Sequence, residues 1–149
     1  MVTETKNETA ELLERMYKNV KMGAESIITL MPKVKDDALR TEMSKELSKL
    51  EGYSAEIGNM LQKEGIEPKE EGVVSRISSK MGINMNVMID SSSSHIAEMM
   101  IEGYTMGITD MTKDIREREN KKVSESSLKL ARNIVAFQEE CFTKMKNFL

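Results

Sequence analysis

Several features that stabilise small secreted or sheet-rich domains are scarce in this chain. Its 149 residues include one cysteine, Cys141, two prolines and no tryptophan, and aromatic residues make up 4%. A single cysteine cannot form a disulfide within the chain, and no apolar leader follows Met1, so the sequence predicts a protein of the reducing cytoplasm. A chain of this length can bury enough apolar surface to fold without a disulfide or a metal. We expect residues 1–149 to form a single domain.

Long apolar runs and clusters of basic residues are also missing. The longest uncharged stretch, Met81 to Ile89, contains two asparagines and is far shorter than the roughly 20 apolar residues of a membrane span. The 22 basic and 25 acidic side chains are interspersed and give a net charge of −3. Nucleic-acid backbones need clustered Lys and Arg side chains. The sequence therefore predicts neither a membrane nor a nucleic-acid partner.

What the chain does contain is a strong helical pattern. Glutamate, lysine, methionine, alanine and leucine are abundant, and this composition favours helices over sheets. Apolar residues recur at three- and four-residue steps in four stretches, so each stretch places them on one helix face. The expected inward positions are Leu13, Val20, Ile27, Leu50, Ile57, Met99, Met106, Ile134 and Met145.

Signals for helix ends separate the first two stretches. Residues 5–8, Thr-Lys-Asn-Glu, have the form of a capping box, which predicts the start of the first helix. Pro32 ends that helix, and Gly65, with Pro68 beyond it, ends the second. Only a few residues around Pro32 join the two helices, which predicts that they are antiparallel neighbours.

The second half of the chain repeats the pattern after a longer connection. Residues 72–89 are interpreted as a crossover segment that contains a short helix. Asp90 and Ser91 to Ser94 are N-cap residues for a third helix, which extends to about Arg116. The polar residues 117–126 turn the chain into a fourth helix. The predicted fold class is all-α: an antiparallel four-helix bundle with a crossover between helices two and three.

A few polar residues fall on faces that should be apolar. At 100° per residue, His95 and Glu102 share a face of the third helix with Ser92, Met99 and Met106. The inner stripe of the fourth helix contains Gln138 and Cys141, and that of the second contains Glu46 and Tyr53. Buried polar groups are costly unless they are paired. We expect these side chains to contact one another, reach water or hold a ligand.

In helix order, short first hairpin and long crossover, the chain resembles the ferritin-like superfamily of rubrerythrins and bacterioferritins. That resemblance implies a bundle whose members hold a carboxylate-bridged di-iron centre, with a Glu from two helices and a Glu-x-x-His from each of the other two. Here only Glu102 occupies such a carboxylate position. Tyr53, Gln138 and Cys141 stand where histidine or glutamate belongs. The resemblance therefore implies the layout with a degenerate or absent metal motif.

Two function hypotheses follow. The first is a non-catalytic structural or interaction protein with no cofactor, in which the polar residues satisfy one another. The alternative is a metal-binding oxidoreductase or storage protein that holds iron or manganese at an atypical site, with candidate ligands His95, Glu98, Glu102, Glu46 and Cys141. The spacing of His95 and Glu98, and of Glu98 and Glu102, places each pair on one helix face. No catalytic residue is predicted, because the sequence has no phosphate-binding glycine loop and no catalytic-triad pattern.

The third helix also has a second apolar side. Ile101, Tyr104, Ile108 and Ile115 lie roughly opposite Met99, and a helix in a four-helix monomer does not need apolar residues nearly all round. We expect a homo-oligomer, as a dimer through this side, or cover by the crossover segment. The fourteen methionines at helical spacing are interpreted as core side chains that fill irregular space.

Overall fold

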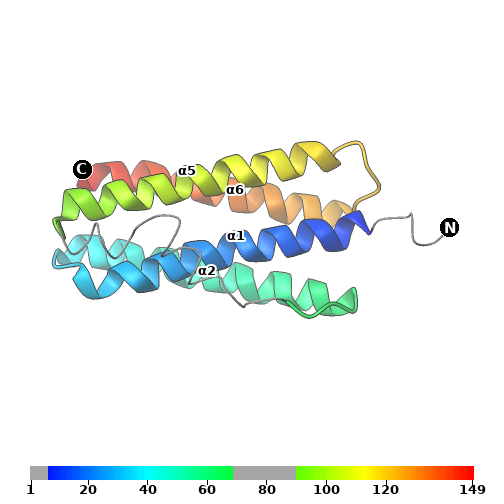
Figure 1. Cartoon of the computed structure of the whole chain (residues 1–149), viewed down its shortest axis with the longest axis horizontal. Coiled ribbons are helices and arrows are strands. Elements are labelled where there is room, and N and C mark those ends of the chain that lie inside the picture. Colours follow the sequence, from blue (N-terminus) through cyan, green and yellow to red (C-terminus); the bar gives the residue numbers. More distant parts are fainter. Residues whose placement is uncertain (1–6, 69–89) are drawn as a thin grey trace.

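The structure is a computed structural model that describes residues 7–68 and 90–149 (Figure 1). In these residues the chain forms four long helices and no strand, which confirms the all-helical prediction. The predicted crossover helix in residues 72–89 lies outside the described residues. The long helices are α1 (Glu8–Leu30), α2 (Asp37–Lys63), α5 (Ser93–Arg118) and α6 (Glu125–Met145), with short 3₁₀ helices η2 (Met31–Lys33) and η3 (Lys146–Phe148).

A polar side chain caps the start of each long helix by accepting a hydrogen bond from a backbone amide of the first turn, which has no partner within the helix. Ser92 caps α5 in this way, as the serine run predicts. The predicted capping box at residues 5–8 is wrong, because α1 begins at Glu8 and its cap is the side chain of Asn7. The caps of α2 and α6 are Asp36 and Ser124.

The ends of α1 and α2 lie where the sequence places them. The α-helix α1 stops at Leu30, and Pro32 lies in the following 3₁₀ turn. Helix α2 stops at Lys63, after which Gly65 has φ +77°, a left-handed conformation that glycine adopts without steric cost. Helix α5 continues two residues beyond the predicted end, to Arg118. That extension brings a charged side chain into the bundle.

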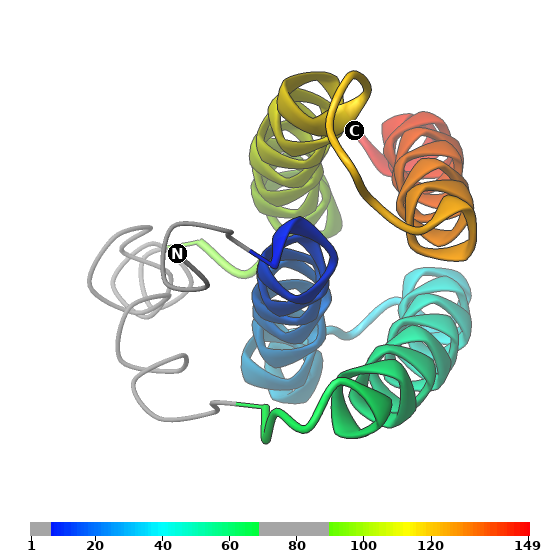
Figure 2. The same cartoon turned by 90° about the vertical axis from the view of Figure 1, so that its right-hand side faces the viewer.

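The four helices surround one core and run lengthwise along the molecule (Figure 1). Helix α1 packs against α2 and α5, and α5 also packs against α6. Viewed end-on, the helices lie around a common centre (Figure 2). Helix α2 ends at one end of the molecule, and α5 begins at the other (Figure 1).

The predicted core faces of α1, α2 and α6 are correct. All of the inward positions named from the sequence are buried in one hydrophobic cluster except Met106, which is half-buried. In the described part of the chain, only Ile28 and Leu149 are large hydrophobic side chains that are exposed. The other large apolar side chains of these four helices are therefore at least partly buried.

The predicted face of α5 is partly wrong. Glu102, expected to face inward, is exposed, and Tyr104, expected to face outward, is only 4% exposed. Helix α5 packs against both α1 and α6, so its buried surface is wide and is centred on residues with seven-residue spacing: Ala97, Tyr104, Met111 and Arg118. Ile115, also expected outside, is buried, whereas Ile101 and Ile108 are half-buried. The outer side of α5 is thus less apolar than the sequence indicates.

Candidate functional site

The first polar cluster in the core joins α2, α5 and α6. The Tyr104 hydroxyl donates a hydrogen bond of 2.6 Å to Glu46 Oε1, and both side chains are buried. Cys141, also buried, lies close enough to Tyr104 and Glu46 to raise the pKa of Tyr104. Glu46 and Cys141 face inward as predicted, and so does Gln138, which belongs to a separate contact described below. Tyr104 is the third member of this first cluster, and the sequence had placed it on the wrong side of its helix.

Burial keeps the protons on this cluster. Loss of solvent raises the pKa of the Glu46 carboxyl to about 9, and the nearby carboxyl of Glu42 raises it further than the Tyr104 hydrogen bond lowers it. Burial likewise raises the pKa values of Tyr104 and Cys141 well above their ordinary range. Glu46 Oε2 nevertheless has no well-aligned hydrogen-bond partner among the described residues. At neutral pH the cluster is uncharged.

A second cluster surrounds Arg118 at the end of α5. The Arg118 side chain is 2% exposed, and its Nη2 donates a 2.8 Å hydrogen bond to Glu11 Oε1. Its Nε lies 3.3 Å from Glu8 Oε1, close enough for an ion pair although not aligned as a hydrogen bond. Nη1 donates to the backbone carbonyl of Asp114 and also lies within ion-pair distance of the carboxylates of Asp114 and Glu117. The buried cation is therefore surrounded by anions from α1 and α5.

A third polar contact crosses the middle of the bundle. Gln138 Nε2 on α6 donates a 2.6 Å hydrogen bond to Asn19 Oδ1 on α1, and Asn19 Nδ2 donates a 3.0 Å bond to the carbonyl of Gly107 on α5. A Cβ atom at residue 107 would lie 2.9 Å from Gln138 Nε2. Gly107 therefore makes room for the glutamine side chain, and the three residues connect α1, α5 and α6.

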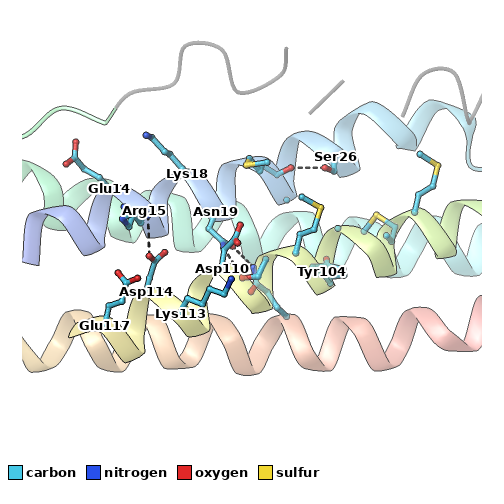
Figure 3. Close-up of a pocket in the computed structure, with 18 of the residues that line it drawn as sticks. Glu14, Arg15, Lys18, Asn19, Ser26, Tyr104, Asp110, Lys113, Asp114 and Glu117 are labelled. Atoms are coloured by element: carbon cyan, nitrogen blue, oxygen red, sulfur yellow. Dashed lines mark hydrogen bonds and ion pairs between the residues drawn. The ribbon is translucent and has the colours of Figure 1, made fainter. Parts of the chain in front are cut away.

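A groove of about 700 Å³ lies over this contact, between α1 and α5 (Figure 3). Its lining includes the half-buried Met22 and Met106, the buried core residues Met99 and Met100, and the polar Asn19 and Gln138. Arg15 and Asp114 meet across one end, with 3.4 Å between Arg15 Nη1 and Asp114 Oδ1 (Figure 3). The groove therefore combines an apolar thioether surface with polar groups, as ligand pockets of this volume do.

Charged residues of both signs line the rim of this groove. Glu14 and Lys18 come from α1, and Asp110 and Lys113 come from α5 (Figure 3). None of these four takes part in an ion pair with another of the residues that the structure describes. By contrast, Arg15 at the end of the groove is paired with Glu11 as well as with Asp114. The rim thus has two cations and two anions that are available to a ligand.

The candidate metal ligands do not lie together. Glu46 and Cys141 are in the core cluster, whereas His95 Nδ1 lies 3.4 Å from the exposed Glu98 near the start of α5. Nine residues of helix, roughly 13 Å, separate His95 from Tyr104 in the core cluster. Glu102 is exposed. Within residues 7–68 and 90–149, no three His, Cys, Asp or Glu side chains come close enough to hold one metal ion.

Sequence reasoning missed Arg118 and Asn19. Arg118 lies seven residues after Met111 and fourteen after Tyr104, so a seven-residue reading of α5 finds it on the buried face. Asn19 directly precedes the buried Val20, and its only signal in the sequence is this position on the edge of the apolar stripe. Both residues use their polar ends to reach another helix.

No family model, curated protein or solved structure matches the chain. Among the described helices, none has an apolar stretch long enough to cross a membrane.

Proposed function

We propose that this protein is a non-catalytic interaction protein that binds a partner along the groove between α1 and α5. The observation that carries the proposal is the groove itself, with the half-buried Met22 and Met106 in its lining and, on its rim, two cations and two anions that form no ion pair with another described residue. Methionine surfaces adapt to varied apolar partners, and unpaired rim charges select partners by electrostatic complementarity.

The state of the buried titratable groups supports binding over catalysis. General acids and bases work best with pKa values near the operating pH. Burial instead raises the pKa of Glu46 to about 9. It also raises the pKa values of Tyr104 and Cys141, which lie even farther from pH 7. These groups hold their protons at pH 7 and face the core, so they serve packing and hydrogen bonding.

We place the chain in an antiparallel, ferritin-like four-helix layout. The short η2 turn between α1 and α2 supports this, as does the position of α5, which begins at the opposite end of the molecule from the end of α2 (Figure 1). In that layout, too, the second helix ends and the third begins at opposite ends of the bundle. The alternative of an iron or manganese protein has less support, because no three of its five candidate ligands come together. The cytoplasmic location remains a prediction from the single cysteine.

An apolar fluorescent dye tests whether the groove binds ligands. Anilinonaphthalene sulfonate fluoresces when it enters an apolar site, and we expect saturable binding to the folded protein at pH 7. Replacing both Met22 and Met106 with Glu places charge on the groove surface and should weaken dye binding at least tenfold. The matched control replaces Ile28 and Leu149, which are exposed and do not line the groove, with Glu. Equal loss in both variants, or in neither, would contradict the proposal.

Self-association through the outer side of α5 is a separate proposal. Its remaining support is that Ile101 and Ile108, which flank Tyr104 on the same side of α5, are only half-buried. Replacing both with Lys should lower the mass measured by light scattering, and exposed Thr105 and Thr109 supply the control positions for the same charge. A monomeric mass for the unaltered protein at high concentration would rule this proposal out.

A further inference from the structure

The groove is about as long as a helix of four to five turns. Its lining residues extend from Glu11 to Ser26 on α1 and from Met99 to Glu117 on α5. At 1.5 Å per residue these stretches measure roughly 22 Å and 27 Å. A helical segment of about 15 to 18 residues has the same length.

The width of the groove fits one face of a helix. A volume of about 700 Å³ spread over such a length gives a mean cross-section of roughly 30 Å². A helix with its side chains is about 10 to 12 Å in diameter. The groove could therefore enclose about a third of the cross-sectional area of such a helix. That third corresponds to the apolar stripe of an amphipathic helix, which covers about 100° of its circumference.

The chemistry of the lining points the same way. Met22 and Met106, the half-buried methionines of the lining, have flexible and polarisable side chains, and such side chains accept apolar side chains from helical partners. Asn19 is held by its bonds to Gln138 and Gly107, so the deeper part of the groove keeps its shape without a ligand.

The rim charges distinguish a helix from a lipid-like ligand. Glu14 and Lys18 on one rim, and Asp110 and Lys113 on the other, present both signs on each side. An amphipathic helix has charged residues on both flanks of its apolar stripe and can pair with both rims at once. An acyl chain has a charge only at one end, so most of the rim would remain unpaired.

We infer that the groove binds one amphipathic α-helix of a partner protein, with its apolar stripe on the methionines and residues of both charges along its flanks. This inference rests on the proposed function and specifies its partner. Exposed ion pairs contribute little affinity individually, so the rim sets the orientation and choice of the helix while the methionines supply most of the binding.

The test uses two labelled peptides of 18 residues and the full-length protein. The first peptide has a leucine stripe at helical spacing with Glu and Lys on its flanks, and the second has the same composition with the leucines distributed around the helix. We expect fluorescence anisotropy to show at least tenfold tighter binding of the first peptide, and circular dichroism to show a gain in helix. Replacing Met22 and Met106 with Glu should abolish this preference, and the Ile28 and Leu149 control should keep it.

Charge reversal tests the role of the rim. Replacing Lys18 and Lys113 with Glu should weaken binding of the striped peptide three- to tenfold. Replacing the peptide's flanking Glu residues with Lys should reverse this loss. A merely structural effect of the two substitutions would not be reversed in that way.

The remaining outcomes of these experiments would contradict either the helical partner or the proposed function itself. Displacement of the dye by palmitate, with no preference for the striped peptide, would overturn the helical partner and leave the groove as a ligand site. Failure of both dye and peptide to bind would overturn the proposed function as well. Preferential peptide binding that appears only after residues 72–89 are replaced by a glycine–serine linker of equal length would show that the groove belongs to the chain's own connection, which also contradicts a partner helix.

Discussion

Arg118 and Glu46, two buried ionisable side chains of the bundle, are each 2% exposed, yet their surroundings differ completely. Arg118 lies near one end of the bundle, where carboxylates from α1 and α5 surround its guanidinium. Glu46 lies among α2, α5 and α6, with a hydroxyl as its hydrogen-bond donor and another carboxyl close by. One site is densely charged and the other is neutral.

The difference shows how each charge is made tolerable inside the protein. A guanidinium cannot release its proton, so Arg118 has to be buried together with anions. A carboxyl group can take up a proton, so Glu46 becomes neutral and needs no cation. Helix ends help only the first site: Glu8 and Glu11 lie in the first turn of α1, and Arg118 ends α5, positions at which the helix dipoles favour these charges.

The largest effect should come from removing the buried cation. Replacing Arg118 with Met removes the buried counter-charge of Glu8, Glu11 and Asp114 and leaves them only the exposed Arg15 and Lys121. We expect a loss of about 3 to 5 kcal/mol in the free energy of unfolding. Urea denaturation at pH 7 measures it, with Arg116→Met, an exposed arginine two residues earlier, as the control. A loss below about 1 kcal/mol would mean that Arg118 is no more important than a surface charge.

The neutral site should respond to pH instead. The folded-state pKa of Glu46, about 9, lies above the unfolded value of 4.5, so its contribution to stability is fully present below pH 4.5 and is lost as the pH rises toward 9. The slope in that window is about 1.4 kcal/mol per pH unit. Glu46→Gln, which cannot ionise, should remove that slope and be more stable than the unaltered protein at pH 8, by a few kcal/mol. Parallel pH dependences of the two proteins in urea denaturation would show that Glu46 is ionised when buried.

A site with no ionisable group extends the comparison, and here the expected effect is smaller. Gly107→Ala gains helix propensity but pushes Gln138 away from Asn19, so we expect a net loss of about 1 kcal/mol. In a Gln138→Ala background the obstruction is gone, and the same change should stabilise by roughly 1 kcal/mol. A double-mutant cycle measures the coupling. Equal effects of Gly107→Ala in the two backgrounds would disprove the steric role of Gly107.

The smallest effect should come from His95 and Glu102, two polar residues that the sequence had placed in the core. Replacing His95 with Leu and Glu102 with Met should change the free energy of unfolding by less than about 1 kcal/mol, because one residue is exposed and the other contacts an exposed carboxylate. Thermal unfolding of the unaltered protein should also be insensitive to EDTA. A clear loss of stability in both measurements would favour the metal-binding alternative.

The sequence predicts the helices better than their contacts. Caps and breakers such as Ser92, Pro32 and Gly65 act locally, so they could be read directly. Which face of α5 is buried depends on both of the helices that it packs against, α1 and α6. Counting in steps of three and four residues from Ser92 therefore predicted that Glu102 is buried, whereas the buried residue is Tyr104. The buried charge of Arg118 could not be predicted because its partners, Glu8 and Glu11, are more than one hundred residues away in the chain.

That long separation has a kinetic consequence. The hairpins α1–α2 and α5–α6 are closed by short turns and can form early, whereas the Arg118 contacts with α1 and the Asn19–Gly107 bond, 88 residues apart, form only when the two hairpins dock. Interactions that form after the folding transition state slow unfolding without speeding folding. In this bundle Arg118 should therefore determine how long the docked state lasts, and its loss should appear almost entirely as faster unfolding.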